Sequence, residues 1–497
     1  MKFRNNAAWA VAALVATVAC HAAPKPAALP ASPARPASPA LAALARDIDA
    51  ILSQPSLDHS YWGVLVKSLK GGDTLYALNP RKLMIPASNM KIVTLAAAAE
   101  RLGWDYTYDT QVFAAGEIES GALRGDLIVV GSGDPSVTDK DAEALFAGWA
   151  ERLKSSGVRT IAGRIIGDDD AFEDNGLGFG WSWDDLADDY AAGVSALQFN
   201  ENAVRVTVAA GPVAGDSAGI SITPPGSGLD VVSSVTTSAA GASSISTHRL
   251  PGSMRLELRG SIPLAAAPAT LTVSVENPTL FFVSALRQAL IAHGIDVRGP
   301  AVDIDDVHDA PPRPRAPLVT HRSAPLSTLA IRLMKVSQNL YAETLLKTMA
   351  TSFPRSAERG RTEVAAVLQT WGMGPDALIQ RDGSGLSRYD YVTAEALVTI
   401  LSHVDRDGRL RAPFESALPI AGRDGSLTNR MKGTAAEGNA RAKTGSMSNV
   451  RGLSGYVSAA DGEPLVFSIL ANNFETPATT IADATDKIVV RLAAFSR

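Results

Sequence analysis

The stretch Ile85-Pro86-Ala87-Ser88-Asn89-Met90-Lys91 decides the fold that we expect for this chain. It opens an apolar segment that runs through Leu102 and has the pattern of a buried helix. Ser88 and Lys91 are three residues apart, so a helix would present both side chains on one face. A serine hydroxyl becomes a good nucleophile when a neighbouring base takes its proton. Burial of Lys91 would lower its pKa and leave a neutral amine for that work.

Two further motifs follow along the chain, Ser337-Gln338-Asn339 and Lys443-Thr444-Gly445-Ser446. The ordered set Ser-x-x-Lys, Ser-x-Asn and Lys-Thr-Gly indicates serine acyl-transfer chemistry. Ser337 is predicted to relay a proton between Lys91 and a leaving amine, and the Asn339 amide to hold a peptide group of the substrate. Each motif alone has a simpler explanation as a helix cap, a polar pair in a loop or a turn before a strand. The prediction therefore rests on their joint order.

The third motif is predicted to begin a strand beside the nucleophile. Lys443 would supply a positive charge for a substrate carboxylate. Thr444 and Ser446 would add hydroxyl donors, and Gly445 would let a ligand approach the backbone. The N–H groups of Ser88 and Ser446 are the predicted oxyanion-hole donors.

The first residues have the pattern of an export signal. Lys2 and Arg4 precede an apolar stretch over residues 7–19, and small residues after it offer a cleavage site. We expect a signal peptide over residues 1–22 and an Ala/Pro-rich linker over residues 23–44. The predicted location is the periplasm, with at most a peripheral contact with the membrane.

Composition excludes several classes of protein. The net charge of -5 lacks the basic excess of a nucleic-acid-binding protein. The seven histidines show no paired ligand spacing, so we expect neither a metal site nor another cofactor. Lipid attachment at Cys20, the sole cysteine, is the less favoured alternative because Thr17 stands where a residue such as Leu is wanted.

Two other stretches of the sequence resemble functional motifs. Gly215-Asp216-Ser217-Ala218-Gly219 fits the nucleophile elbow of α/β-hydrolases, but a predicted strand follows it where that elbow requires a helix. We interpret it as a hairpin loop. The run Asp168-Asp169-Asp170 lacks the spacing of an EF-hand loop and is interpreted as a solvated loop.

The chain resembles the low-molecular-mass class C penicillin-binding proteins, which are D-alanyl-D-alanine carboxypeptidase/endopeptidases. The resemblance covers nearly the whole chain beyond the predicted signal peptide and includes the three motifs above. It also includes Gly125-Asp126-Leu127, Gly133-Asp134-Pro135, Trp181-Ser182-Trp183-Asp184-Asp185, Asp382-Gly383-Ser384-Gly385-Leu386-Ser387 and Asp424-Gly425-Ser426-Leu427. One departure is the Ser-Gln-Asn motif, where relatives commonly have Ser-Asp-Asn, and we expect little effect from it.

This resemblance implies an α/β (α+β) fold: a serine β-lactamase/transpeptidase-like domain, built as an antiparallel sheet with helices and interrupted by a large two-part insertion. The transpeptidase-like domain would comprise residues 45–102 and 318–497. The inserted domain II would comprise residues 103–202 and 269–317. Short alternating runs separated by Gly, Ser and Pro predict a nested all-β domain III over residues 203–268.

By the same resemblance, Ser88 attacks the carbonyl of the penultimate D-Ala of a peptidoglycan stem peptide or cross-link, and water hydrolyses the acyl-enzyme. Peptidoglycan is the implied partner, and β-lactam antibiotics are the implied covalent inhibitors. The stretch with Trp181, Trp183, Asp184 and Asp185 is implied to recognise the third residue of the stem peptide. We favour Asp185 over Asp184 as the partner of its free amine.

Two rival functions remain open. A serine β-lactamase shares this chemistry, but Leu75 occupies the place, ahead of Leu78-Asn79, where the class A enzymes need a Glu. A catalytically inactive cell-wall binding protein on the same fold is disfavoured by the intact side chains of the three motifs. The sequence does not distinguish carboxypeptidase from endopeptidase preference.

Overall fold

The computed structural model describes residues 38–497. The predicted signal peptide, Cys20 and the first part of the predicted linker lie outside the described residues. Helix α1 (Pro39–Leu52) begins inside that predicted linker, and the Ser38 side chain caps it by accepting from the Leu41 N–H. The linker prediction is therefore corrected for its last residues, because proline is tolerated in the first turn of a helix and Ala and Leu favour helix.

A five-stranded antiparallel sheet joins the two ends of the described chain. Its order is β18-β19-β20-β1-β2, and β1 pairs with β20 over its whole length, with Tyr61 opposite Asn472. The strands are β1 (Tyr61–Ser68), β2 (Thr74–Leu78), β18 (Arg441–Met447), β19 (Val450–Ser458) and β20 (Pro464–Asn472). We call the part of the molecule built on this sheet the Ser88 domain.

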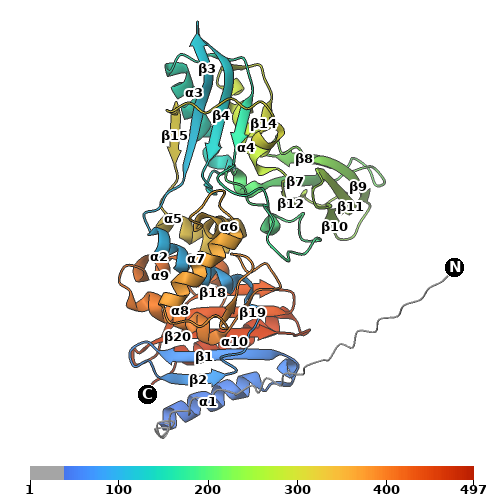
Figure 1. Ribbon diagram of the computed structural model, residues 1–497. Coiled ribbons are helices and arrows are strands. Elements are labelled where there is room, and N and C mark those ends of the chain that lie inside the picture. The colour runs from blue at the N-terminus through green and yellow to red at the C-terminus, as the bar shows by residue number, and fades with distance from the viewer. Residues whose placement is uncertain (1–37) are drawn as a thin grey trace, which may run out of the picture.

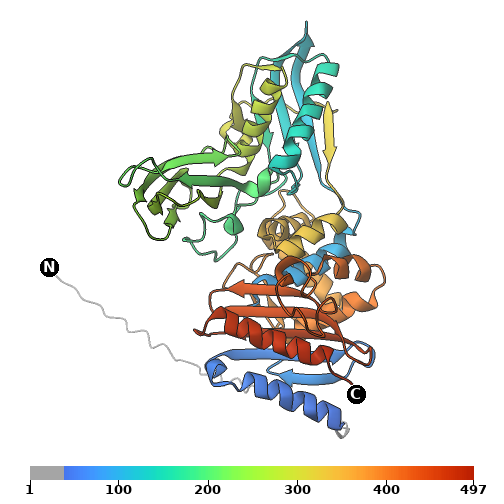
Figure 2. The same ribbon diagram turned by 180° about the vertical axis from the view of Figure 1, so that it is seen from behind.

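Alternate side chains of β20 point to opposite faces of this sheet, as the pleat requires. Phe467 and Ile469 pack with α1 and α10 (Ala478–Ala493), which lie together on one face (Figure 2). Val466 and Leu470 join the core of the other face, where most of the helices lie between the sheet and the inserted domain (Figure 1). These helices are α2 (Met90–Leu102), α5 (Leu326–Ile331), α6 (Asn339–Thr348), α7 (Ala357–Thr370), α8 (Ala394–Arg406) and α9 (Arg411–Ala417).

The inserted domain is a mixed sheet covered by two helices. Its strands are β3 (Asp109–Glu119), β4 (Ala122–Gly131), β5 (Thr160–Ile161), β6 (Ile165–Asp168), β13 (Asp296–Val297), β14 (Ala301–Asp303) and β15 (Val319–Arg322). Helices α3 (Asp139–Ser155) and α4 (Pro278–Ala292) pack on it through a shared apolar core. Within residues 38–497, none of the helices combines the length and the apolar content needed to cross a bilayer.

The nested β domain projects sideways from the inserted domain (Figure 1). It contains two three-stranded sheets, β12-β7-β8 and β10-β11-β9. Their strands are β7 (Ala203–Ala209), β8 (Gly219–Thr223), β9 (Asp230–Ser238), β10 (Ser244–His248), β11 (Arg255–Pro263) and β12 (Ala269–Ser274). Because β12 pairs with β7, the domain extends to Ser274, beyond the predicted end at residue 268. Ser217 lies in the loop between the paired strands β7 and β8, which confirms the predicted hairpin loop.

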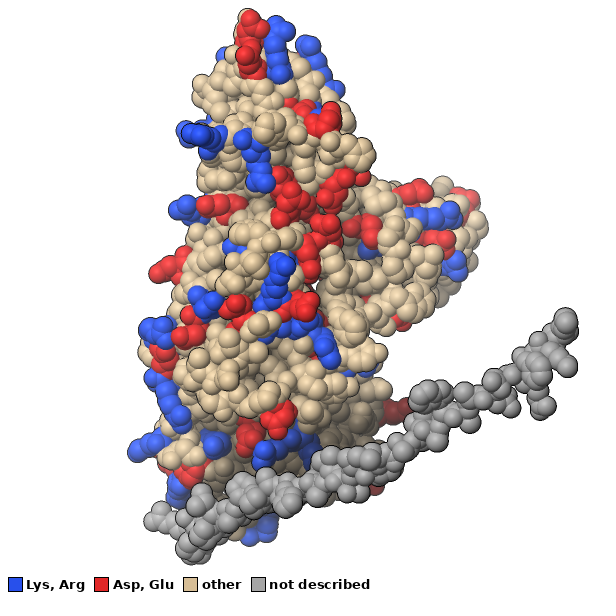
Figure 3. Space-filling model, viewed as in Figure 1, with Lys and Arg blue, Asp and Glu red and all other residues tan. Residues whose placement is uncertain are grey.

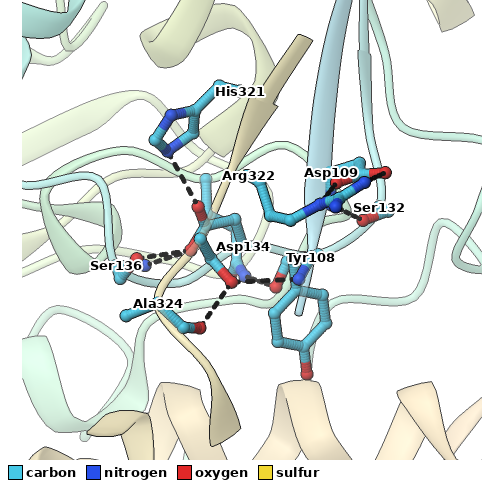
Figure 4. Close-up of polar contacts among 11 residues, drawn as sticks. Tyr108, Asp109, Ser132, Asp134, Ser136, His321, Arg322 and Ala324 are labelled. Carbon is cyan, nitrogen blue, oxygen red and sulfur yellow. Dashed lines mark hydrogen bonds and ion pairs between the residues drawn. The ribbon is translucent and has the colours of Figure 1, made fainter. Parts of the chain in front are cut away.

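Two chain segments connect the Ser88 domain to the inserted domain, and they run side by side (Figure 4). The Ser323 N–H donates to the Tyr108 carbonyl at 2.9 Å, and the Tyr108 N–H donates to Ser323 Oγ at 2.9 Å. Arg322 pairs with Asp109 at 2.9 Å just above them. Since β15 pairs with β3, residues 319–322 belong to the inserted domain and correct the predicted boundary at 318.

Candidate active site

Ser88 lies in a single 3-10 turn, η2 (Ala87–Asn89), directly before α2. Ala87 has φ 45°, a left-handed conformation that costs a non-glycine residue free energy. The loop over residues 382–387 packs against this turn, and a Cβ on Gly385 (φ 84°) would overlap the Ala87 carbonyl oxygen. The loop can therefore approach the nucleophile only because position 385 is glycine.

Lys91 is fully buried in the first turn of α2. Its Nζ lies 3.0 Å from Ser88 Oγ, 2.6 Å from Asn339 Oδ1 and 2.9 Å from the Ser384 carbonyl oxygen. Burial lowers the pKa of Lys91 to about 7, although three nearby carboxyl groups oppose the shift. A substantial share of the amine in contact with the nucleophile is therefore neutral near pH 7, as the sequence predicts.

Asn339 begins α6 and joins two domains at the site. Its Oδ1 accepts from Lys91, and its Nδ2 donates to the Tyr190 carbonyl at 2.7 Å. Tyr190 belongs to η3 (Asp189–Ala191) of the inserted domain. The second N–H of this amide is not used in these contacts, so the predicted contact with a substrate peptide group stays a prediction.

Ser337 has φ 68° and follows the π-helical turn η6 (Arg332–Val336). Lys443 Nζ donates to Ser337 Oγ at 2.8 Å and to the Thr444 carbonyl at 2.8 Å. Lys443 is fully buried, and burial together with the charge of Lys91 lowers its pKa well below its usual range. Its direct side-chain partner is the Ser337 hydroxyl, and the predicted supply of positive charge to a substrate carboxylate stays a prediction.

Gly445 on β18 holds the strand close to the nucleophile turn. A Cβ at this position would lie 2.6 Å from the Pro86 carbonyl oxygen and 2.6 Å from the end of the Asn89 side-chain amide. With its amide oriented to satisfy its neighbours, Asn89 accepts from the Gly445 N–H at 3.2 Å and donates to Ser454 Oγ at 2.9 Å. Gly445 is therefore needed for packing against η2, and the predicted approach of a ligand to its backbone stays a prediction.

An open cavity of about 570 Å³ lies over these groups. It brings together the predicted residues Ser88, Ser337, Asn339, Thr444, Ser446, Asp184 and Asp185. Both predicted oxyanion-hole residues, Ser88 and Ser446, therefore face one space. The lining also includes Tyr190, Arg388 and Ser426, which sequence reasoning missed. Ser426 lies in the Asp424–Leu427 stretch, and its Oγ accepts from Thr444 Oγ1 at 2.7 Å.

The stretch Trp181–Asp185 reaches the site from the inserted domain, but its members differ in role. Asp185 lines the cavity and accepts from the Tyr190 hydroxyl at 2.8 Å. Asp184 accepts from Ser182 Oγ at 2.6 Å, which lowers its pKa. Trp181 and Trp183 are not among the residues that line the cavity, and their predicted substrate contacts stay a prediction. Trp181 Nε1 donates to Asp382 Oδ2 at 2.9 Å, and Trp183 packs on His248 at the surface.

Gln338, the residue that departs from the family pattern, faces away from Lys91. Its Oε1 accepts from the Leu340 N–H at 2.9 Å, and its Nε2 donates to Glu201 Oε2 at 2.9 Å. Glu201 belongs to the inserted domain and also pairs with Arg332. Gln338 therefore caps α6 and connects two domains without touching the reacting groups.

A second cavity, of about 380 Å³, lies between the inserted and nested domains and includes Asp169, Asp303 and Asp305 in its lining. Figure 3 shows acidic side chains gathered in the angle between these domains. Asp168 beside it is only 4% exposed, on β6, and pairs with Arg313 at 3.2 Å. The prediction of a solvated acidic loop is therefore wrong for Asp168, because the apolar strand before it is buried between β4 and β14.

Gly445→Ala tests the packing of β18 on η2. The added Cβ would force the strand away from Ser88, so we expect acylation of Ser88 by a fluorescent penicillin to slow about tenfold or more. Gly408→Ala is the matched control, since a Cβ there meets nothing within 4 Å. A Gly445→Ala protein labelled at the wild-type rate would contradict this account of the site.

Comparison with known proteins gives matches over nearly the whole described chain. The model of the D-Ala-D-Ala carboxypeptidase 3 (S13) family matches residues 44–494. A D-alanyl-D-alanine carboxypeptidase of Actinomadura sp. (strain R39) is 35% identical over 468 residues, which cover 91% of this chain and 85% of that protein.

Solved structures give the same result for the fold. The crystal structure of penicillin binding protein 4 (dacB) from Haemophilus influenzae has a TM-score of 0.80 and 26% identity, covering 90% of this chain and 98% of that one. Its structure complexed with a novel β-lactam has a TM-score of 0.73 and 24% identity, covering 89% and 98%. These matches confirm the predicted α/β fold, the serine peptidase activity and the resemblance to low-molecular-mass class C penicillin-binding proteins. The chain belongs to the D-Ala-D-Ala carboxypeptidase 3 (S13) family.

Proposed function

We propose that this D-Ala-D-Ala carboxypeptidase works through an acyl-enzyme on Ser88, also cleaves peptidoglycan cross-links as an endopeptidase, and is acylated by penicillins. The observation that carries the proposal is the buried Lys91 amine, 3.0 Å from Ser88 Oγ. Export to the periplasm is part of the proposal and rests on the pattern of residues 1–22. The complex of the Haemophilus influenzae protein with a β-lactam supports the inhibitor class.

The acylation step begins with proton transfer. The neutral Lys91 amine takes the proton of Ser88 Oγ, and the oxygen attacks the carbonyl carbon of the penultimate D-Ala. The backbone N–H groups of Ser88 and Ser446 would stabilise the oxyanion. The C–N bond then breaks, the acyl group stays on Ser88, and the leaving amine needs a proton. Water later hydrolyses the ester.

Ser337 is placed to deliver that proton. Its Oγ accepts from Lys443 Nζ at 2.8 Å, so its own hydrogen remains free to point into the cavity. The same reasoning applies to Ser426, whose Oγ accepts from Thr444 Oγ1 and whose hydrogen is free for a substrate oxygen. In this proposal Lys443 orients Ser337 and replaces the proton that Ser337 gives to the leaving amine, while hydroxyl groups contact the terminal carboxylate. During hydrolysis Lys91 returns its proton to Ser88 Oγ, and the attacking water gives a proton through Ser337 to Lys443, so every group recovers its starting state.

Asp185 is proposed to bind the free amine on the third residue of the stem peptide. It lines the same cavity as Ser88, and Tyr190 fixes its carboxylate at 2.8 Å. The open cavity leaves room for a chain that continues beyond the stem peptide, which supports action on cross-links as well as on free ends.

Asp185→Asn tests this assignment. With a stem peptide that has a free amine on its third residue, we expect kcat/KM to fall about tenfold, since a bond to a charged group is lost. With the same peptide acetylated on that amine, wild type and variant should match. Asp184→Asn is the control and should stay within about twofold of wild type. An equal loss for both peptides would contradict an amine-specific role.

The pH dependence of acylation follows from the Lys91 pKa. Because the neutral amine is the base and its pKa is about 7, the rate should rise with pH through about 7 and level off above it. Lys91→Arg, which stays protonated, should lose acylation at every pH. The measurement is the second-order rate of labelling by a fluorescent penicillin. A flat profile from about pH 5.5 to 8.5 would argue against Lys91 as the base.

The nucleophile itself is tested by labelling wild type and Ser88→Ala with a fluorescent penicillin on a denaturing gel. A stable label on wild type that disappears in Ser88→Ala would support the proposal. Penicillin that is rapidly destroyed without label would favour a β-lactamase. Intact penicillin and no label would favour an inactive wall-binding protein.

A further inference from the structure

Three acidic side chains that do not line the cavity lie near enough to the Lys91 amine for their charges to act on it. Glu343, Asp382 and Asp390 are 4%, 1% and 0% exposed. Glu343 stands four residues after Asn339 on α6, so both side chains reach the same region from one helix face. Asn339 contacts Lys91 directly, whereas Glu343 contacts the backbone that Lys91 uses. None of these carboxyl groups has a part in the reaction described above.

Glu343 fixes the carbonyl that accepts from Lys91. Its Oε1 accepts from the Ser384 N–H at 2.7 Å, and its two oxygens share the Gly383 N–H at 3.0 and 2.9 Å. The carbonyl of that same Ser384 accepts from Lys91 Nζ at 2.9 Å. A single loop residue, Ser384, therefore connects the Glu343 carboxyl group to the Lys91 amine.

The other two carboxyl groups hold the ends of the same loop. Asp382 accepts from the Gly385 N–H at 2.7 Å and the Ser387 N–H at 2.6 Å. Asp390 accepts from the Arg381 N–H at 2.5 Å, and its Oδ2 is buried without a partner. The chain thus places three acids around a loop of small residues where one carbonyl faces the catalytic amine.

The three carboxyl groups also affect the protonation of Lys91 through their charge. The groups that act on Lys91 are Asp382, Glu343 and Asp390, which favour its protonated form, and the buried Lys443 beside it, which disfavours that form. Burial and the charge of Asp382 raise the pKa of Glu343, while the N–H groups of Gly383 and Ser384 favour its ionised form. The N–H bonds to both Glu343 oxygens favour the ionised form, in which Glu343 adds negative charge near the Lys91 amine.

We propose that Glu343 is a positioning residue for Lys91, which it serves by fixing the Ser384 carbonyl and by supplying negative charge near the amine. The inference rests on the proposed acyl transfer at Ser88. The loop has a second support, because Thr94 Oγ1 donates to the Gly383 carbonyl at 2.7 Å. The fold of the loop therefore does not depend on Glu343 alone. Substitution of Glu343 can thus test its effect on Lys91 without removing every support of the loop.

The experiment measures the second-order rate of penicillin labelling against pH for wild type and two variants of the full chain. Glu343→Gln keeps the length of the side chain and removes the charge, so the midpoint of the profile should move to lower pH by about half a unit or more. Glu343→Asp keeps the charge and is too short to reach both N–H groups. It should keep the midpoint near that of wild type and lower the plateau about tenfold. Glu358→Gln, an exposed site on α7, is the control and should match wild type.

The outcomes separate this inference from the proposed function. A folded Glu343→Gln protein with the wild-type midpoint and plateau, beside a labelled wild type, would overturn the role of Glu343 alone. Failure of both Glu343 variants to fold, judged by circular dichroism, would also contradict it, because Glu343 would then be a residue of the fold. Absence of label on the wild type would overturn the proposed function, and this inference with it.

Discussion

The Lys91 amine, enclosed beside Ser88 with three acceptors around its Nζ, is the interaction on which the rest of the site depends. A buried amine costs free energy unless its hydrogens find partners, and here each partner comes from a different part of the chain. Ser88 precedes α2, Asn339 begins α6, and Ser384 lies in a loop that follows β16 (Leu378–Ile379). Holding this one group in place therefore requires the tertiary fold.

The central sheet and the inserted domain both help to hold the Lys91 amine in place, through different contacts. Pairing of β1 with β20 closes the Ser88 domain around α2, and β18 packs on η2 through Gly445. The inserted domain then contacts the site from the other side. Its Tyr190 carbonyl accepts from Asn339, and its Trp181 donates to Asp382. The large insertion is thus joined to the groups that hold the catalytic amine, not merely placed above them.

Much of this site was predictable because it depends on local spacing. The helix repeat places Ser88 and Lys91 together, and motif order indicates the chemistry. The strand β20 is a nearly continuous apolar run, which is typical of a strand buried on both faces of its sheet. The boundary errors at residues 268 and 318 have one cause: β12 and β15 are recognised as parts of their sheets only by their partners β7 and β3.

Contacts between distant residues were beyond the reach of sequence reasoning. Nothing near Glu343 or Asp390 in the sequence signals that they lie near Lys91, since α6 and the 382–387 loop meet only in the fold. Lys443 and Gly445 were predicted as site residues with roles toward the substrate, which gave no hint of their contacts within the fold. Lys443 contacts Ser337 and Gly445 contacts the η2 turn because β18 packs against both in the fold, and the sequence near these residues does not indicate that packing.

The proposed chemistry requires that Ser88 carries the acyl group during turnover. The most direct measurement is acid quenching of the protein during turnover of a stem peptide ending in D-Ala-D-Ala, followed by trypsin digestion and mass spectrometry. Cleavage after Lys82 and Lys91 releases residues 83–91, which contain Ser88. Our account predicts the acyl mass on that fragment, at Ser88. An acyl group on any other fragment, such as the one with Ser217, would contradict it.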